Sequence, residues 1–213
     1  MVKLQEALGN FVSGQLRRPT GAFGRLVMTR MLNRGNTPLT DETLARLELR
    51  RSNTVLDVGF GGGRALRQAA RRVTDGHLWG LDFSPDVVAA GQRSLADLIA
   101  AGRLELLRGD VGDMPLRDAL FDRIVTLNTI YFWPDPARAA GELLRVLKPG
   151  GLLAIGYTGA AKMREYPLLT DTFRFWEAEE VEALLQEAGF TEIRSDALRG
   201  KVTRGDFVTV ARR

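Results

Sequence analysis

Short apolar runs alternate with longer stretches of helical period from residue 53 onward. The runs are rich in Val, Ile and Leu, and turn-forming residues separate them from the helical stretches. This alternation is typical of strands joined by crossover helices, which build a mostly parallel sheet with helices on its faces. We predict strands over residues 53–58, 77–82, 103–107, 121–127 and 152–157. The pattern therefore limits this part of the chain to an α/β fold.

Two helices of this region carry clear start signals. The pairs Ser84-Pro85 and Asp135-Pro136 each place a side-chain oxygen at an N-cap and a proline at the first helical position. We expect the first helix to reach about Ala100. We expect the second to end at residues 148–151, whose sequence Lys-Pro-Gly-Gly forbids its continuation.

Both ends of the chain depart from the alternation. A helix over residues 177–188 precedes two apolar runs, 190–195 and 207–211, whose short polar connector predicts an antiparallel hairpin. Before residue 53 the period is helical, with a cap at residues 39–41 and a helix that runs to about Arg50. We therefore divide the chain into an N-terminal helical cap or substrate lid, residues 1–38, and one main domain, residues 39–213.

The composition removes several classes of chemistry. The chain has no cysteine and one histidine, His77. The lack of thiols excludes disulfides, zinc-thiolate sites and thiol nucleophiles, and a lone histidine before an apolar run argues against a histidine triad. We expect no metal site. Because no apolar run is long enough to span a membrane and the first residues lack a signal pattern, we predict a cytoplasmic protein.

Basic residues are concentrated near the N-terminus. Residues 1–51 hold nine Lys/Arg against four Asp/Glu, in a chain whose formal net charge is +4. Such a segment suits an anionic substrate, weak contact with an anionic lipid surface, or nucleic acid. A solvated arginine-rich surface is the alternative.

The strongest motif follows the first predicted strand. Residues 57–63 read DVGFGGG, an acidic residue and then glycines at alternating positions that open directly into a helix. Side-chain-free residues let a ligand approach the backbone. Asp82 ends the second strand, where a carboxylate can accept hydrogen bonds from both hydroxyls of a ribose. The pair indicates nucleoside recognition, and Arg64 argues against a dinucleotide, whose fingerprint needs Gly or Ala at that position.

These features resemble the first motif of the class I S-adenosylmethionine-dependent methyltransferases. The resemblance extends over residues 40–213 and includes, in the family's order, LDFS at 81–84, RGDV at 108–111, the fourth-strand region ending at Asn128, LKPGG at 147–151 and the terminal hairpin. Within that family the chain is similar to the small methyltransferases related to ubiquinone/menaquinone-biosynthesis C-methyltransferases, of the methyltransferase domain 11 type. The resemblance implies a Rossmann-like, doubly wound, seven-stranded sheet of order 3-2-1-4-5-7-6 with strand 7 antiparallel.

The resemblance also implies how S-adenosylmethionine is held. The backbone of Gly59, Gly61 and Gly63 would lie against the methionine portion, Asp57 would orient that loop, and Asp82 would hold the ribose.

Four more residues complete the implied cofactor site. Phe83 would pack on the adenine, Asp110 would accept from its exocyclic amine, and the Val111 amide would meet a ring nitrogen. Asn128 would lie near the methionine amine or the acceptor pocket, or serve as a turn residue. Phe83 has the alternative of being a core residue.

The acceptor site is predicted from aromatic residues. Tyr131 is the predicted catalytic residue, in a positioning role, because a phenol after the fourth strand would face the sulfonium. Its alternative is an aromatic that closes the top edge of the sheet, and Trp133 shares that ambiguity. Phe11 and Phe23 of the N-terminal segment, and the long connection over residues 158–174, are further candidates.

The predicted reaction is methyl transfer to carbon, oxygen, nitrogen or sulfur of a small organic acceptor, either apolar or anionic. Methyl transfer requires mainly alignment and exclusion of water, and the chain offers no obvious general base. One alternative is an RNA or protein methyltransferase, although the chain lacks a separate nucleic-acid domain. Another is a non-catalytic module that binds S-adenosylmethionine. Arsenite methylation is argued against by the lack of cysteine.

Overall fold

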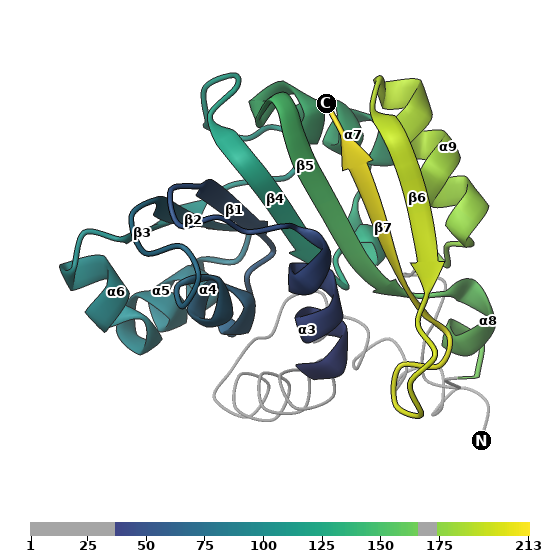
Figure 1. The fold of residues 1–213 in the computed structure, drawn as a ribbon, viewed down its shortest axis with the longest axis horizontal. Coiled ribbons are helices and arrows are strands. Elements are labelled where there is room, and N and C mark those ends of the chain that lie inside the picture. The colour runs from purple at the N-terminus through teal and green to yellow at the C-terminus, as the bar shows by residue number, and fades with distance from the viewer. Residues whose placement is uncertain (1–36, 166–173) are drawn as a thin grey trace.

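A seven-stranded sheet of order β3-β2-β1-β4-β5-β7-β6 organises the protein (Figure 1). The computed structural model describes residues 37–165 and 174–213. The strands are β1 (Thr54–Val58), β2 (His77–Asp82), β3 (Leu104–Arg108), β4 (Phe121–Leu127), β5 (Leu147–Thr158), β6 (Thr191–Ala197) and β7 (Asp206–Arg212). The predicted strand order is confirmed. The predicted cap over residues 1–38, and with it Phe11 and Phe23, lies outside the described residues except for residues 37 and 38.

Because β1 to β5 are parallel, their carboxyl ends lie along one edge of the sheet. The β1–β2, β1–β4, β2–β3 and β4–β5 pairs are parallel, and β7 runs antiparallel to both β5 and β6, as predicted. The last residue of β1, Val58, is paired with Leu81 on one side and Thr126 on the other. The loops that follow β1, β2 and β4 therefore leave the sheet side by side.

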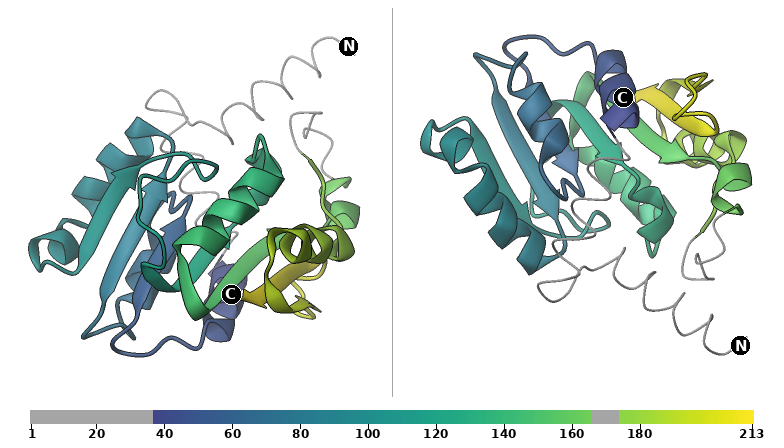
Figure 2. Two further views of the ribbon diagram at one scale, coloured as in Figure 1. Left: turned by 90° about the horizontal axis from the view of Figure 1, so that it is seen from above. Right: turned by 90° about the horizontal axis from the view of Figure 1, so that it is seen from below.

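Helices cover both faces of the sheet, as the turned views in Figure 2 show. The helices are α3 (Thr37–Arg46), α4 (Arg64–Ala69), α5 (Pro85–Ser94), α6 (Ala96–Ala100), α7 (Pro136–Val146), α8 (Ala160–Met163) and α9 (Ala178–Ala188), with a 3₁₀ turn, η1 (Ile130–Phe132). No helix within residues 37–165 and 174–213 is both long and apolar enough to cross a membrane.

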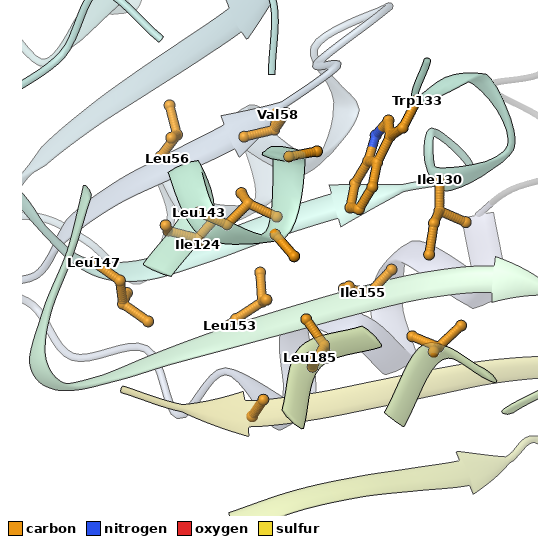
Figure 3. Close-up of a cluster of buried hydrophobic side chains, with 14 of the residues drawn as sticks. Leu56, Val58, Ile124, Ile130, Trp133, Leu143, Leu147, Leu153, Ile155 and Leu185 are labelled. Atoms are coloured by element: carbon orange, nitrogen blue, oxygen red, sulfur yellow. The ribbon is translucent and has the colours of Figure 1, made fainter. Parts of the chain in front are cut away.

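Alternation along the strands divides the core between the two faces. Leu56, Ile124 and Leu153 point toward α7 and α9, where they join one buried cluster with Leu143 and Leu185 (Figure 3). Their sequence neighbours face the other way and pack under α3, α4 and α5. Side chains at successive strand positions point to opposite faces, so a strand buried on both faces reads as a continuous apolar run.

The predicted caps are confirmed by hydrogen bonds. The Ser84 hydroxyl accepts from the Val87 amide at 3.4 Å, and the Asp135 carboxylate accepts from the Arg138 amide at 3.0 Å. Gly189 ends α9 with a φ of 100°, a left-handed conformation that favours glycine.

Three predicted element boundaries differ most from the structure. The helix expected to reach Ala100 is broken at Leu95, whose φ is −114° and whose side chain is buried. The helix expected to reach Arg50 ends at Arg46. The next residue, Leu47, is fully buried, and Glu48 adopts a φ of 48°, which an α-helix does not allow. Strand β5 begins at residue 147 rather than 152, since Leu147 pairs with Phe121 and the Gly150 amide donates to the Arg213 carbonyl at 2.9 Å.

Candidate functional site

The glycine loop between β1 and α4 has a backbone that only glycine adopts readily. Gly59, Gly61 and Gly63 have φ values of 71°, 49° and 74°. The Gly59 amide donates to the Leu81 carbonyl at 2.7 Å, which anchors the loop beside the end of β2. A Cβ atom at Gly61 would meet no heavy atom closer than the Gly59 carbonyl oxygen, at 3.9 Å. The middle of the loop is therefore an open cradle of backbone.

Two carboxylates stand at the base of this loop. Asp57 and Asp82 lie on the adjacent strands β1 and β2 and are 3% and 7% exposed. Asp82 accepts from the Gly61 amide at 3.3 Å and from the Ser84 amide at 3.0 Å. Among the described residues, no group donates a hydrogen bond to the Asp57 carboxylate.

The environment of the pair disfavours two negative charges. Burial, and secondarily repulsion from Asp82, raises the pKa of Asp57 to about 8. Burial also raises the pKa of Asp82, although its two backbone hydrogen bonds oppose that shift. A ligand that brings hydroxyl or ammonium donors would satisfy both carboxylates.

The predicted adenine contacts follow β2 and β3. Phe83 is 42% exposed, an unusual state for a large apolar side chain beside a strand end. Asp110 is exposed and accepts from the Gly112 amide at 2.7 Å, so the turn that carries it is ordered. Val111 is partly buried against the core cluster. Since β2 pairs with β3 from Leu78 to Asp82, the loops carrying these residues are neighbours.

Asn128 and Tyr131 are joined after β4. Asn128 has a φ of 54°, and its side-chain oxygen accepts from the Tyr131 hydroxyl at 2.9 Å. The same hydroxyl lies 3.2 Å from the Thr158 carbonyl oxygen and accepts from the Thr158 amide. Burial raises the pKa of Tyr131 far above its ordinary value, so the phenol stays protonated at neutral pH.

Trp133 lies in the core cluster of Figure 3 and is 7% exposed. Its ring therefore contributes to packing beneath the site. A role for this residue in an acceptor pocket remains a prediction, as it does for Phe11 and Phe23.

Two threonines after β4 and at its end, which the sequence did not indicate, support the glycine loop. The Thr126 hydroxyl donates to the Val58 carbonyl at 2.9 Å and is hydrogen-bonded to the Thr129 hydroxyl. A methyl group at Gly59 would overlap the Thr129 Cγ2 atom. Thr129 therefore fills the space that the missing Gly59 side chain leaves.

Two residues of α7 hold the loop after β3. The Glu142 carboxylate accepts from the Met114 amide at 2.7 Å and from the Arg145 Nε at 2.6 Å. The Arg145 guanidinium donates to the Leu116 carbonyl at 2.7 Å and to the Met114 carbonyl at 3.2 Å. The only sequence signal is an i,i+3 acidic-basic pair, which is common on helices.

Comparison with known proteins shows what this part of the chain is similar to. Residues 56–155 match the family model described as "Methyltransferase domain". The uncharacterized methyltransferase YdaC of Bacillus subtilis is 30% identical over 120 residues, 56% of this chain and 64% of that protein. The demethylmenaquinone methyltransferase of Lactiplantibacillus plantarum is 27% identical over 180 residues, 71% of this chain and 76% of that protein.

A solved structure shares the fold. A SAM dependent methyltransferase from Aquifex aeolicus aligns with a TM-score of 0.68 at 24% identity, covering 86% of this chain and 97% of that chain. The alignments span between 32% and 64% of the length of the first four curated relatives.

Proposed function

We propose, on the premise that this chain carries a class I S-adenosylmethionine-dependent methyltransferase domain, that it is an enzyme which methylates a small organic acceptor. S-adenosylmethionine is the cofactor of the domain. The observation that carries the proposal is the meeting of an open glycine loop and two buried carboxylates, Asp57 and Asp82, at one edge of the sheet. Ligands of open α/β sheets bind at this edge.

The residues present fit the cofactor. The Gly61 cradle leaves space for a ligand against the backbone, and the Asp82 carboxylate is suited to two ribose hydroxyls. Phe83, one of two exposed large hydrophobic side chains among the described residues, offers a face for the adenine. The Asp110 oxygen that does not bind Gly112 is available to an exocyclic amine.

The chain contributes alignment rather than proton transfer. When bound, the cofactor would supply an electrophilic methyl group, so the task of the chain is to align an acceptor with it and to exclude water. Tyr131, with a pKa raised by burial, acts as a neutral phenol that positions Asn128 and the end of β5. Orientation of this kind can lower the barrier by several kcal/mol, on the order of 7–11 at best.

One relative and the sequence each support a class of acceptor. A relative named for demethylmenaquinone favours an apolar acceptor, and the basic N-terminal segment favours an anionic group or weak contact with a lipid surface. Nucleic acid is not the proposed partner. We place the reaction in the cytoplasm, with residues 1–38 as a lid over the acceptor and Phe11 and Phe23 in its lining.

Calorimetric titration with S-adenosylmethionine, S-adenosylhomocysteine and NADH tests the cofactor. We expect micromolar binding of the two sulfur nucleosides and none of NADH. Asp82→Ala should weaken that binding by about 2 kcal/mol or more, roughly 30-fold, because two hydroxyls lose a charged acceptor. Asp75→Ala, an exposed carboxylate ion-paired with Arg51, is the control and should bind normally.

A turnover assay distinguishes an enzyme from a module that only binds the cofactor. Release of S-adenosylhomocysteine with a panel of acids, phenols, thiols and quinone precursors would establish an enzyme. Tight cofactor binding without turnover on any small molecule, RNA or protein would instead support a binding module.

A further inference from the structure

Trp176, just before α9, forms a rigid aromatic platform near the ends of β4 and β5. The residue is 1% exposed, and its indole Nε1 donates to the Ile130 carbonyl at 3.3 Å. Its own carbonyl accepts from the Ala160 amide at 2.9 Å. Because Ile130 begins η1 after β4 and Ala160 begins α8 after β5, Trp176 is fixed by its indole to the first segment and by its backbone to the second.

Arg174 is stacked on this platform. Its guanidinium carbon lies 3.8 Å from the centroid of the Trp176 ring, within the range of a cation–π contact. Its amide donates to the Tyr131 carbonyl at 3.4 Å. Tyr131 in turn bonds to Asn128, so Arg174 is tied to the same edge of the sheet as the proposed cofactor site.

No described carboxylate neutralises this cation. The nearby acidic residue Glu177 is engaged by Arg164 at 3.2 Å, and Glu180 accepts from the Glu177 amide at 2.9 Å as part of the α9 cap. Within residues 37–165 and 174–213, the Arg174 guanidinium makes no hydrogen bond or ion pair. A stacked guanidinium keeps its N–H donors in the plane of the group, where they can take two oxygens of one anion.

We propose that Arg174 binds an oxyanion group, a carboxylate or a phosphate, of the methyl acceptor. The inference rests on the proposed function and names its substrate class: an anionic molecule whose acidic group docks at the ends of β4 and β5. The indole holds the guanidinium in place before the ligand arrives, which reduces the entropy that binding would otherwise cost.

The probes are benzoate, phenyl phosphate and neutral benzamide, titrated calorimetrically into the full chain saturated with S-adenosylhomocysteine. We expect millimolar binding of at least one anion and none of benzamide. Arg174→Ala should weaken the anion at least tenfold, and Arg174→Lys should restore only part of the loss because an ammonium lacks the planar fork. Arg199→Ala removes an exposed arginine of the β6–β7 connection and should leave binding within twofold.

Whichever of benzoate and phenyl phosphate binds more tightly identifies the oxyanion group that Arg174 prefers. Equal binding in Arg174→Ala and the parent, benzamide binding as tight as benzoate, or no anion binding by the parent would each overturn the inference. Failure of the proposed function has a different signature, because the parent would then not bind S-adenosylhomocysteine at all. An unchanged affinity of Arg174→Ala for S-adenosylhomocysteine verifies that the variant is folded.

Discussion

Replacing Arg145 with alanine should loosen the loop that carries Asp110 and so weaken recognition of the adenine. Arg145 donates to the carbonyls of Met114 and Leu116 and to the Glu142 carboxylate, and its side chain is 30% exposed. All three acceptors lose a donor in the variant. The loop then keeps two side-chain contacts with α7, the Glu142 bond to the Met114 amide and the longer, exposed ion pair between Asp113 and Arg138.

The magnitude follows from these contacts. At about 1 kcal/mol for each lost hydrogen bond, the free energy of unfolding should fall by about 2–3 kcal/mol. The further ion pair with Asp118 adds little, because that side chain is 74% exposed. For a domain of this size the melting temperature should fall by roughly 5–10 °C.

The decisive assay compares two ligands. S-adenosylhomocysteine carries the exocyclic amine that Asp110 is proposed to accept from, and S-inosylhomocysteine carries an oxygen there. We expect Arg145→Ala to lose about tenfold in affinity for the first, about 1.4 kcal/mol, and little for the second. The control is Arg138→Ala, on the same helix, whose exposed ion pair with Asp113 is 3.7 Å long.

The ratio of the two affinities distinguishes positioning from general damage. A variant that is merely less stable would bind both ligands less well, in the same proportion. An unchanged ratio in a destabilised Arg145→Ala would therefore refute the claim that Arg145 acts on the adenine through the loop.

Three other predictions follow from the site. Gly59→Ala should lower the unfolding free energy by about 2 kcal/mol or more, from left-handed strain and overlap with Thr129 Cγ2, and adding Thr129→Ser should recover part of the loss in a denaturant titration. If the double variant recovered nothing, the overlap would not be the cause. Asp57 keeps a proton in the folded state, whereas the unfolded chain releases that proton near the ordinary pKa of 3.8. The free energy of unfolding should therefore fall as pH rises from about 4 to about 8, by at most about 1.4 kcal/mol per pH unit. Asp57→Asn should remove the part of that slope that Asp57 contributes and leave the part due to Asp82, whose pKa burial also raises. A parent whose stability is flat between pH 5 and 8 would contradict the argument. Tyr131→Phe should cost about 1–3 kcal/mol in chemical denaturation, because its hydroxyl partners are left partly unpaired, and an unchanged midpoint would count against that role.

Local sequence signals determined much of the framework. The caps at Ser84 and Asp135, the stop at Gly189 and the glycine motif each depend on a few consecutive residues and on backbone preferences. They were predictable because steric limits on φ and ψ act within one turn of chain. The position of Asp82 at a strand end followed from the same short-range pattern.

Only the tertiary structure decided the contacts that brace and extend the site. Three contacts join segments that leave different strands. Thr129 packs over Gly59, Arg145 donates hydrogen bonds to the loop after β3, and Arg174 stacks on a buried indole. The break at Leu95 has the same origin, since burial of that side chain outweighs the helical preference of its neighbours. Such contacts depend on which strands are adjacent and on which side chains meet at their ends, and these are properties of the assembled sheet that no short stretch of sequence contains.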